Sequence, residues 1–135
     1  MKLLVAISQT PETTARIAFK DGGTAFDPSG VNFIMNPYDE WYALVRALEL
    51  KEEKGGSVTV IHCGPLANEV TIRKALAIGA DDAIRVDMEP DSAYAVVQQI
   101  AAHATTAGYD IIFSGKESID YNGFLVAGLL AVLLN

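Results

Sequence analysis

Short apolar runs alternate with segments of helical periodicity along most of this chain. Each run has the length of a strand, and each is followed by a stretch in which apolar residues recur at a spacing of three and four. The strand-like runs lie at residues 3–8, 57–63, 82–86 and 110–113. Repeated strand–helix alternation is typical of right-handed βαβ units, in which helices cover both faces of parallel strands. The sequence therefore predicts an α/β fold with a parallel, doubly wound sheet.

Capping residues and periodicity locate the predicted helices. Asn36 suits the cap of the first helix, Pro37 its first turn, and Asp39 the positive end of its dipole. The last helix is predicted to begin near Asn122 or Gly123. The predicted inward faces of the first two helices are Trp41, Leu44, Val45 and Leu48, then Val70, Ile72, Leu76 and Ile78.

One segment departs from the strand–helix alternation. Between residues 16 and 33 the apolar runs are short, and two turn signals separate them: Asp-Gly-Gly at 21–23 and Asp-Pro-Ser-Gly at 27–30. Such sequences favour tight turns between short strands. We therefore expect a small hairpin excursion on the surface, near residues 16–33.

Size and charge narrow the class of protein. The 135 residues are expected to form one α/β domain, residues 1–135, and the 50% hydrophobic content argues against disorder. The net charge of −7 argues against nucleic-acid binding. The most apolar stretch, residues 124–134, is shorter than the roughly 20 residues that cross a bilayer, so no membrane insertion is expected. The single cysteine, Cys63, fits a reducing, cytoplasmic setting.

The segment GKESIDYNG at 115–123 follows an apolar strand in the manner of a phosphate loop. A Walker A motif needs glycine where Asp110 stands, and serine or threonine where Glu117 stands. The Rossmann glycine pattern is also absent from the first strand–helix turn. Residues 115–123 are therefore not a Walker A motif, and the turn after the first strand is not a Rossmann motif.

No catalytic or metal-binding set is evident. His62 and Cys63 are adjacent on a predicted strand, so their side chains point to opposite faces and cannot pair. With two histidines and one cysteine, no spacing resembles a zinc site. We expect no catalytic residues and no metal, and hence a protein that is not itself an enzyme.

A ligand site is expected where the parallel strands end. Ligands of open α/β sheets bind beyond the carboxyl ends of the strands, which places Ser8, residues 63–65 and residues 114–116 along one rim. Small residues such as Ala6 at these ends leave room for a flat ring. Backbone N–H groups at Asn122 and Gly123 are candidates for holding an anion. The alternative is that these residues are ordinary loops and caps.

Several motifs, in order, resemble the amino-terminal half of the electron transfer flavoprotein beta subunit. The opening MKLLVAIS resembles the family's first strand, and residues 35–56 its Met-Asn-Pro-aromatic-x-Glu helix. Cys-Gly-Pro at 63–65 and IRKALAIGADDAIRV at 72–86 match two further motifs. GKESID at 115–120 resembles the family's Gly-Lys-x-x-Ile-Asp. The resemblance covers nearly the whole chain.

This resemblance implies a fold of the adenine-nucleotide alpha-hydrolase-like type and a non-catalytic electron carrier. The family's beta subunit forms a heterodimer with an alpha subunit, which provides most of the contacts to a redox-active FAD. The beta subunit itself holds a structural AMP or, in electron-bifurcating members, a second FAD. Flavin dehydrogenases are its expected electron donors, docking through parts absent from this chain. By position, the cofactor-binding residues are Ala6, Asn36, Pro37, Tyr38, Asp39, Cys63, Gly115, Asp120, Tyr121, Asn122, Gly123, Phe124, Leu125 and Val126.

The chain departs from the family at the phosphate loop. Members usually have Asn-Gln-Thr-Gly there, whereas Phe124, Leu125 and Val126 stand in this sequence. Lys116, Tyr121 and Asn122 are candidate substitutes for the missing polar groups. AMP, FAD and an empty site remain the alternatives. The very apolar last helix also leads us to expect a fragment of a longer beta subunit, or a chain covered by a partner. A stand-alone adenine-nucleotide-binding module of the stress-protein type is the alternative function, and a scaffold with a vestigial pocket is a third.

Overall fold

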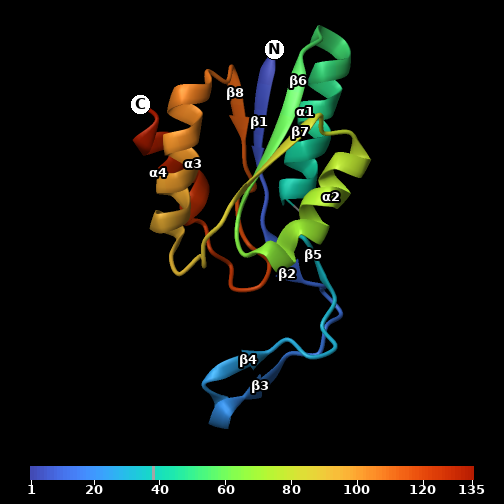
Figure 1. Cartoon of the computed structure of the whole chain (residues 1–135), viewed down its shortest axis with the longest axis vertical. Helices are drawn as coiled ribbons and strands as arrows, with labels where there is room; N and C mark the ends of the chain where they lie inside the picture. The colour runs from blue at the N-terminus through green and yellow to red at the C-terminus, as the bar shows by residue number, and fades with distance from the viewer. Residues whose placement is uncertain (38) are drawn as a thin grey trace.

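The protein is described by a computed structural model that covers residues 1–37 and 39–135. Tyr38, one of the expected nucleotide-site residues, lies outside the described residues. Four parallel strands form the main sheet in the order β7 (Asp82–Val86), β6 (Ser57–Cys63), β1 (Lys2–Ala6) and β8 (Ile111–Phe113). This order confirms the predicted α/β fold with a parallel sheet (Figure 1).

Two helices cover each face of the sheet (Figure 1). The helices α1 (Asp39–Lys54) and α2 (Glu69–Ile78) pack on one face, and α3 (Ala93–Ala107) and α4 (Leu125–Leu133) pack on the other. Leu3 and Val5 of the central strand point to the first pair, and Leu4 points to the second. All three side chains are fully buried. Burial on both faces explains why the strand sequences are continuous apolar runs.

The buried faces of α1 and α2 differ from those that the periodicity predicted. Trp41 is 43% exposed and Val70 is 59% exposed, although both were expected to face inward. The residues that are buried are Glu40, Ala43, Leu44 and Ala47 in α1, and Thr71, Ile72 and Ala75 in α2. Small side chains such as Ala43, Ala47 and Ala75 allow each helix to approach the sheet closely. The buried face of each helix is therefore slightly rotated from its most apolar face. The sequence contained apolar residues on both faces and could not discriminate between them.

The expected hairpin excursion is present. Strands β3 (Ala18–Lys20) and β4 (Ala25–Asp27) pair in antiparallel fashion across the short helix η1 (Asp21–Gly23). A second antiparallel pair, β2 (Gln9–Pro11) with β5 (Phe33–Met35), connects this hairpin to the sheet domain. The hairpin projects away from the sheet as an arm (Figure 1). Within the residues that the structure describes, no helix is long and apolar enough to cross a membrane.

The observed burial of α2 gives a stability prediction. We expect Ile72→Ala to lower the free energy of unfolding by about 2–5 kcal/mol, because it leaves a cavity at a side chain that is 5% exposed. Val70→Ala, on the exposed face of the same helix, should change it by no more than about 0.5 kcal/mol. Urea unfolding of the two variants measures this difference. Equal losses in both would show that the helix is rotated from the face described.

Candidate functional site

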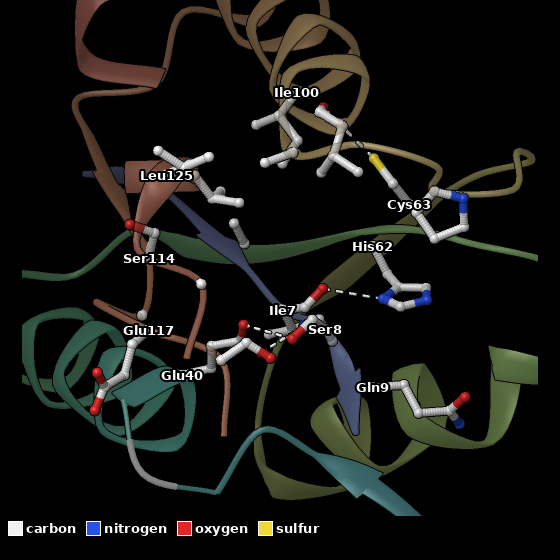
Figure 2. Close-up of a pocket in the computed structure, with 18 of the residues that line it drawn as sticks. Ile7, Ser8, Gln9, Glu40, His62, Cys63, Ile100, Ser114, Glu117 and Leu125 are labelled. Atoms are coloured by element: carbon white, nitrogen blue, oxygen red, sulfur yellow. Dashed lines mark hydrogen bonds between the residues drawn. The ribbon is translucent and has the colours of Figure 1, made fainter. Parts of the chain in front are cut away.

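A cavity of about 530 Å³ opens at the carboxyl ends of β1, β6 and β8. Its floor is formed by the ends of these strands, from residues 6–9, 62–63 and 114, and by Val96 and Ile100 of α3. The loop after β8 and the first turn of α4 form one wall, and Glu40 of α1 forms another (Figure 2). The cavity lies at the sheet edge where ligands of open parallel sheets are bound.

The structure brings about half of the expected site residues to this cavity. Those that line it are Ala6, Cys63, Gly115, Asp120, Tyr121, Gly123, Leu125 and Val126. Those that do not are Asn36, Pro37, Asp39, Asn122 and Phe124. Sequence reasoning did not name Glu40 or Ser92 as site residues, although both line the cavity. The sequence contained one indication of this role: Glu40 and Ser92 each lie at the amino-terminal end of a helix that follows a strand.

The Gly-Lys loop closes on the chain's own carboxylate. The backbone N–H groups of Lys116 and Glu117 both donate to Oδ2 of Asp39, at 3.1 and 2.9 Å. Gly115 allows this approach, because a Cβ atom there would lie 2.7 Å from Cγ of Glu40. These two N–H groups are the ones that a phosphate loop would offer to a ligand. In this structure both N–H groups are therefore occupied by the Asp39 carboxylate of α1.

Asn36 has a different role from the predicted helix cap. Its side-chain Nδ2 donates to the carbonyl oxygen of Glu117 at 2.7 Å, and the residue is fully buried. Helix α1 begins at Asp39, so Asn36 lies outside its first turn. The side chain thus holds the loop after β8 against the segment before α1, next to the Asp39 contact.

Helix α4 begins later than predicted. It starts at Leu125, with Phe124 at the cap position and no side-chain cap, rather than near Asn122 or Gly123. A tight turn holds the preceding residues out of the helix: Ser118 N–H donates to Gly123 O, and Asn122 N–H donates to Ser118 O. The first N–H groups of a helix have no intrahelical partners. Here they lie beside Leu125 and Val126, which line the cavity, so this helix end is the candidate anion position.

Glu40 is a buried carboxylic acid in the cavity wall. Its side chain accepts hydrogen bonds from the Ser8 backbone N–H and from the Ser8 hydroxyl, the latter at 2.7 Å (Figure 2). Burial, as the largest cause, raises the pKa of Glu40 to about 7, and the charge of Asp120 acts in the same direction. The Ser8 hydrogen bonds partly oppose this rise. Glu40 therefore changes charge near neutral pH.

His62 and Cys63 have separate partners, as their adjacent positions on a strand predicted. His62 Nδ1 donates to Ile7 O at 3.0 Å (Figure 2). Its Nε2 accepts from Asn68 Nδ2 at 3.0 Å, so the imidazole is a neutral tautomer. Burial lowers the pKa of His62. Burial also raises the pKa of Cys63 to about 11, so this side chain is a thiol rather than a thiolate. Gly64 is required beside them, since a Cβ atom would lie 2.5 Å from His62 Nε2.

The charged side chains around the cavity are mostly acidic. Four carboxyl groups line it, those of Glu40, Asp91, Glu117 and Asp120. Among the lining residues that the structure describes, Lys116 is the one lysine or arginine, and its Nζ lies 5.5 Å from the ring centre of Phe124. The small and apolar floor suits a flat ring. An anionic group is suited to the α4 end and to Lys116, which line the same cavity as Glu40.

The fold and the cavity define an open α/β domain of the class that binds ligands at the carboxyl edge of its sheet. Residues 24–135 match the electron transfer flavoprotein domain. The whole chain aligns at 34% identity with 53% of the electron transfer flavoprotein subunit beta of Bacillus subtilis. The human subunit beta is 34% identical, over 96% of this chain and 54% of its own length. Protein FixA of Azotobacter vinelandii is 39% identical, over 89% of this chain and 44% of its own length.

The chain belongs to the electron transfer flavoprotein family, in which it resembles the amino-terminal part of beta subunits. This confirms the resemblance seen in the sequence motifs. The chain spans about half the length of the curated relatives it matches.

The raised pKa of Glu40 predicts a specific pH dependence of stability. The folded protein retains a proton on Glu40 up to about pH 7, whereas the unfolded chain releases it near 4.5. Stability from this group is therefore lost as the pH rises from about 4.5 to 7, by roughly 3 kcal/mol. Glu40→Gln should remove this loss, because glutamine stays neutral and can still accept from Ser8. The variant should be more stable than the native chain at pH 8 and similar to it at pH 5.

Urea unfolding at pH 5 and pH 8 tests this prediction. Glu49→Gln is the matched control, since it makes the same chemical change on an exposed part of the same helix. That variant should keep the pH dependence of the native chain. If the Glu40→Gln profile runs parallel to the native profile, Glu40 is not the group that titrates.

Proposed function

We propose that this chain is the nucleotide-holding part of an electron transfer flavoprotein beta subunit. The cavity carries this proposal: its volume of about 530 Å³ lies within the usual range for small-molecule sites, roughly 300–1,000 Å³. Its position at the carboxyl edge of the sheet and the membership of the family support the same conclusion. The proposed ligand is an adenosine monophosphate group, either as AMP or as half of a second FAD.

The residues around the cavity suggest how such a group would be held. The adenine ring would lie over the floor formed by Ala6, Cys63 and Ile100, where small and apolar side chains exclude water. The phosphate would lie at the amino-terminal end of α4, where backbone N–H groups have no side-chain cap. The Lys116 ammonium group lies over the ring of Phe124, the residue at the cap of α4. It would move from this ring to the phosphate. The apolar side chains that replace the family's usual polar triplet leave the phosphate to backbone donors.

The electron-carrier role depends on a partner. We infer that the chain pairs with an alpha subunit and helps to frame the FAD that this subunit holds, as a heterodimer. The flavin supplies the redox chemistry, and the protein contributes binding, orientation and electrostatics. Flavin dehydrogenases would deliver the electrons through regions of the longer relatives that have no counterpart in these residues. A cytoplasmic location is proposed from the single cysteine, Cys63, which is a buried free thiol.

Identification of the bound nucleotide tests this function directly. The chain would be purified alone and after co-expression with an alpha subunit of the family, then denatured, and released nucleotides identified by mass spectrometry. We expect a stable pair that contains FAD and one further adenine nucleotide. If the further nucleotide is AMP, it supports a structural role for the ligand of this chain. If it is a second FAD, it supports an electron-bifurcating type of flavoprotein. A chain that forms homodimers and binds ATP without any alpha subunit would instead support a stand-alone nucleotide-binding module.

The proposed phosphate position makes a sharper prediction. Leu125→Glu places a negative charge in the first turn of α4, which helps the helix dipole but repels a phosphate. We expect AMP binding to weaken about tenfold or more, with adenosine binding unchanged. The control is Leu125→Gln, because glutamine has nearly the same shape as glutamate but no charge. This variant should bind AMP as the native chain does. Titration calorimetry with both ligands measures this, and equal affinities of the two variants for AMP would place the phosphate elsewhere.

A further inference from the structure

Glu40 is a buried acid without a counter-ion. It is 9% exposed, yet among the ion pairs of the described residues none includes it. Its partners are neutral: the Ser8 backbone N–H, the Ser8 hydroxyl and the Asn36 side chain, which also acts to lower the pKa of Glu40. Charges buried in proteins are usually paired, because an isolated ion loses its hydration. An uncompensated carboxyl group in a ligand cavity therefore needs a functional explanation.

The charged groups around Glu40 do not provide compensation. From the loop after β8, Asp120 raises the pKa of Glu40, and the Tyr121 phenol is in turn affected by Glu40. On its own helix, the Asp39 carboxylate is turned to the Lys116 and Glu117 N–H groups. The other walls carry Asp91 and the neutral His62. An incoming phosphate would add further negative charge to this acidic site.

We propose that Glu40 couples nucleotide binding to protonation, taking up one proton from solvent when an anionic nucleotide enters the cavity. This inference rests on the proposed nucleotide-binding function. The step is balanced by one solvent proton, which converts the carboxylate to a carboxylic acid as the ligand binds. The negative charge of the Glu40 carboxylate is then neutralised as the phosphate enters, so the cavity does not hold both charges at once.

The local geometry accommodates the protonated form. A protonated carboxyl group keeps an acceptor oxygen for the Ser8 backbone N–H. Its O–H can donate to the Ser8 hydroxyl oxygen, which reverses the 2.7 Å hydrogen bond. The Ser8 hydrogen then becomes available to a ligand acceptor, since Ser8 also lines the cavity. Glu40 is thus a specificity-determining residue, which favours neutral ligands over anionic ones as the pH rises.

The number of protons taken up on binding provides the test. AMP would be titrated at pH 8 in two buffers that differ in ionisation enthalpy, at which pH its phosphate is already fully ionised. With a pKa of about 7, Glu40 is mostly ionised at pH 8 before AMP binds. If the complex holds this side chain protonated, as proposed, the native chain should take up close to one proton per AMP. Adenosine, which carries no charge, should cause much less uptake. This measurement on the native chain does not depend on any variant.

Two variants then assign the proton to its residue. Glu40→Gln should bind AMP with no proton uptake, and Glu49→Gln should behave as the native chain. Between pH 6 and pH 8 the affinity of the native chain should fall about tenfold relative to that of Glu40→Gln, as expected for one proton on a group titrating near 7.

The outcomes separate the two proposals. AMP binding without proton uptake in the native chain overturns the role of Glu40 and leaves the nucleotide site intact. Uptake that persists in Glu40→Gln overturns it as well, because another group then receives the proton. A chain that binds neither AMP nor adenosine at pH 6 overturns the nucleotide site, and with it the inference about Glu40.

Discussion

Burial of the central strand on both faces is the constraint on which this structure depends. Leu3, Leu4 and Val5 of β1 are fully buried, alternately against the α1–α2 layer and the α3–α4 layer. Parallel neighbours joined by crossover helices cover the strand in this way, because the helices pack on both faces of the sheet. Each crossover helix must then begin at the carboxyl edge of the sheet. The cavity lies at this edge because the helix starts and strand ends all converge there.

Two adjacent carboxylates at the start of α1 show how position determines chemistry. Asp39 accepts two backbone N–H groups from the loop after β8 and holds that loop in place. Glu40, the next residue, points into the protein and meets Ser8 at the end of β1. A rotation of about 100° per residue along a helix separates the two environments. One acid therefore has a structural role, while the other is a titratable group in the cavity wall.

The acidic cavity also bears on what this family member can bind. The floor of the site is apolar and its carboxyl groups outnumber its cations among the described residues. The proposed nucleotide would therefore be held mainly through its ring and through backbone groups at the α4 end. Because residues 124–126 carry apolar side chains, the proposed protonation of Glu40 would be a direct way to lower the negative charge near a phosphate.

The sequence by itself determined the architecture, since the strands at 57–63 and 82–86 and the hairpin are encoded by local apolar runs and turn residues. The order of strands and helices also placed Ser8, Cys63 and residues 114–116 at one edge of the sheet, where the cavity lies. Only the tertiary structure decided which helix faces are buried, as Trp41 and Val70 show, because packing against the sheet chose between two apolar faces. It also decided the roles of Gly115 and Glu40, whose contacts join segments about 75 residues apart. Such contacts depend on three-dimensional proximity and desolvation, which local sequence patterns do not record.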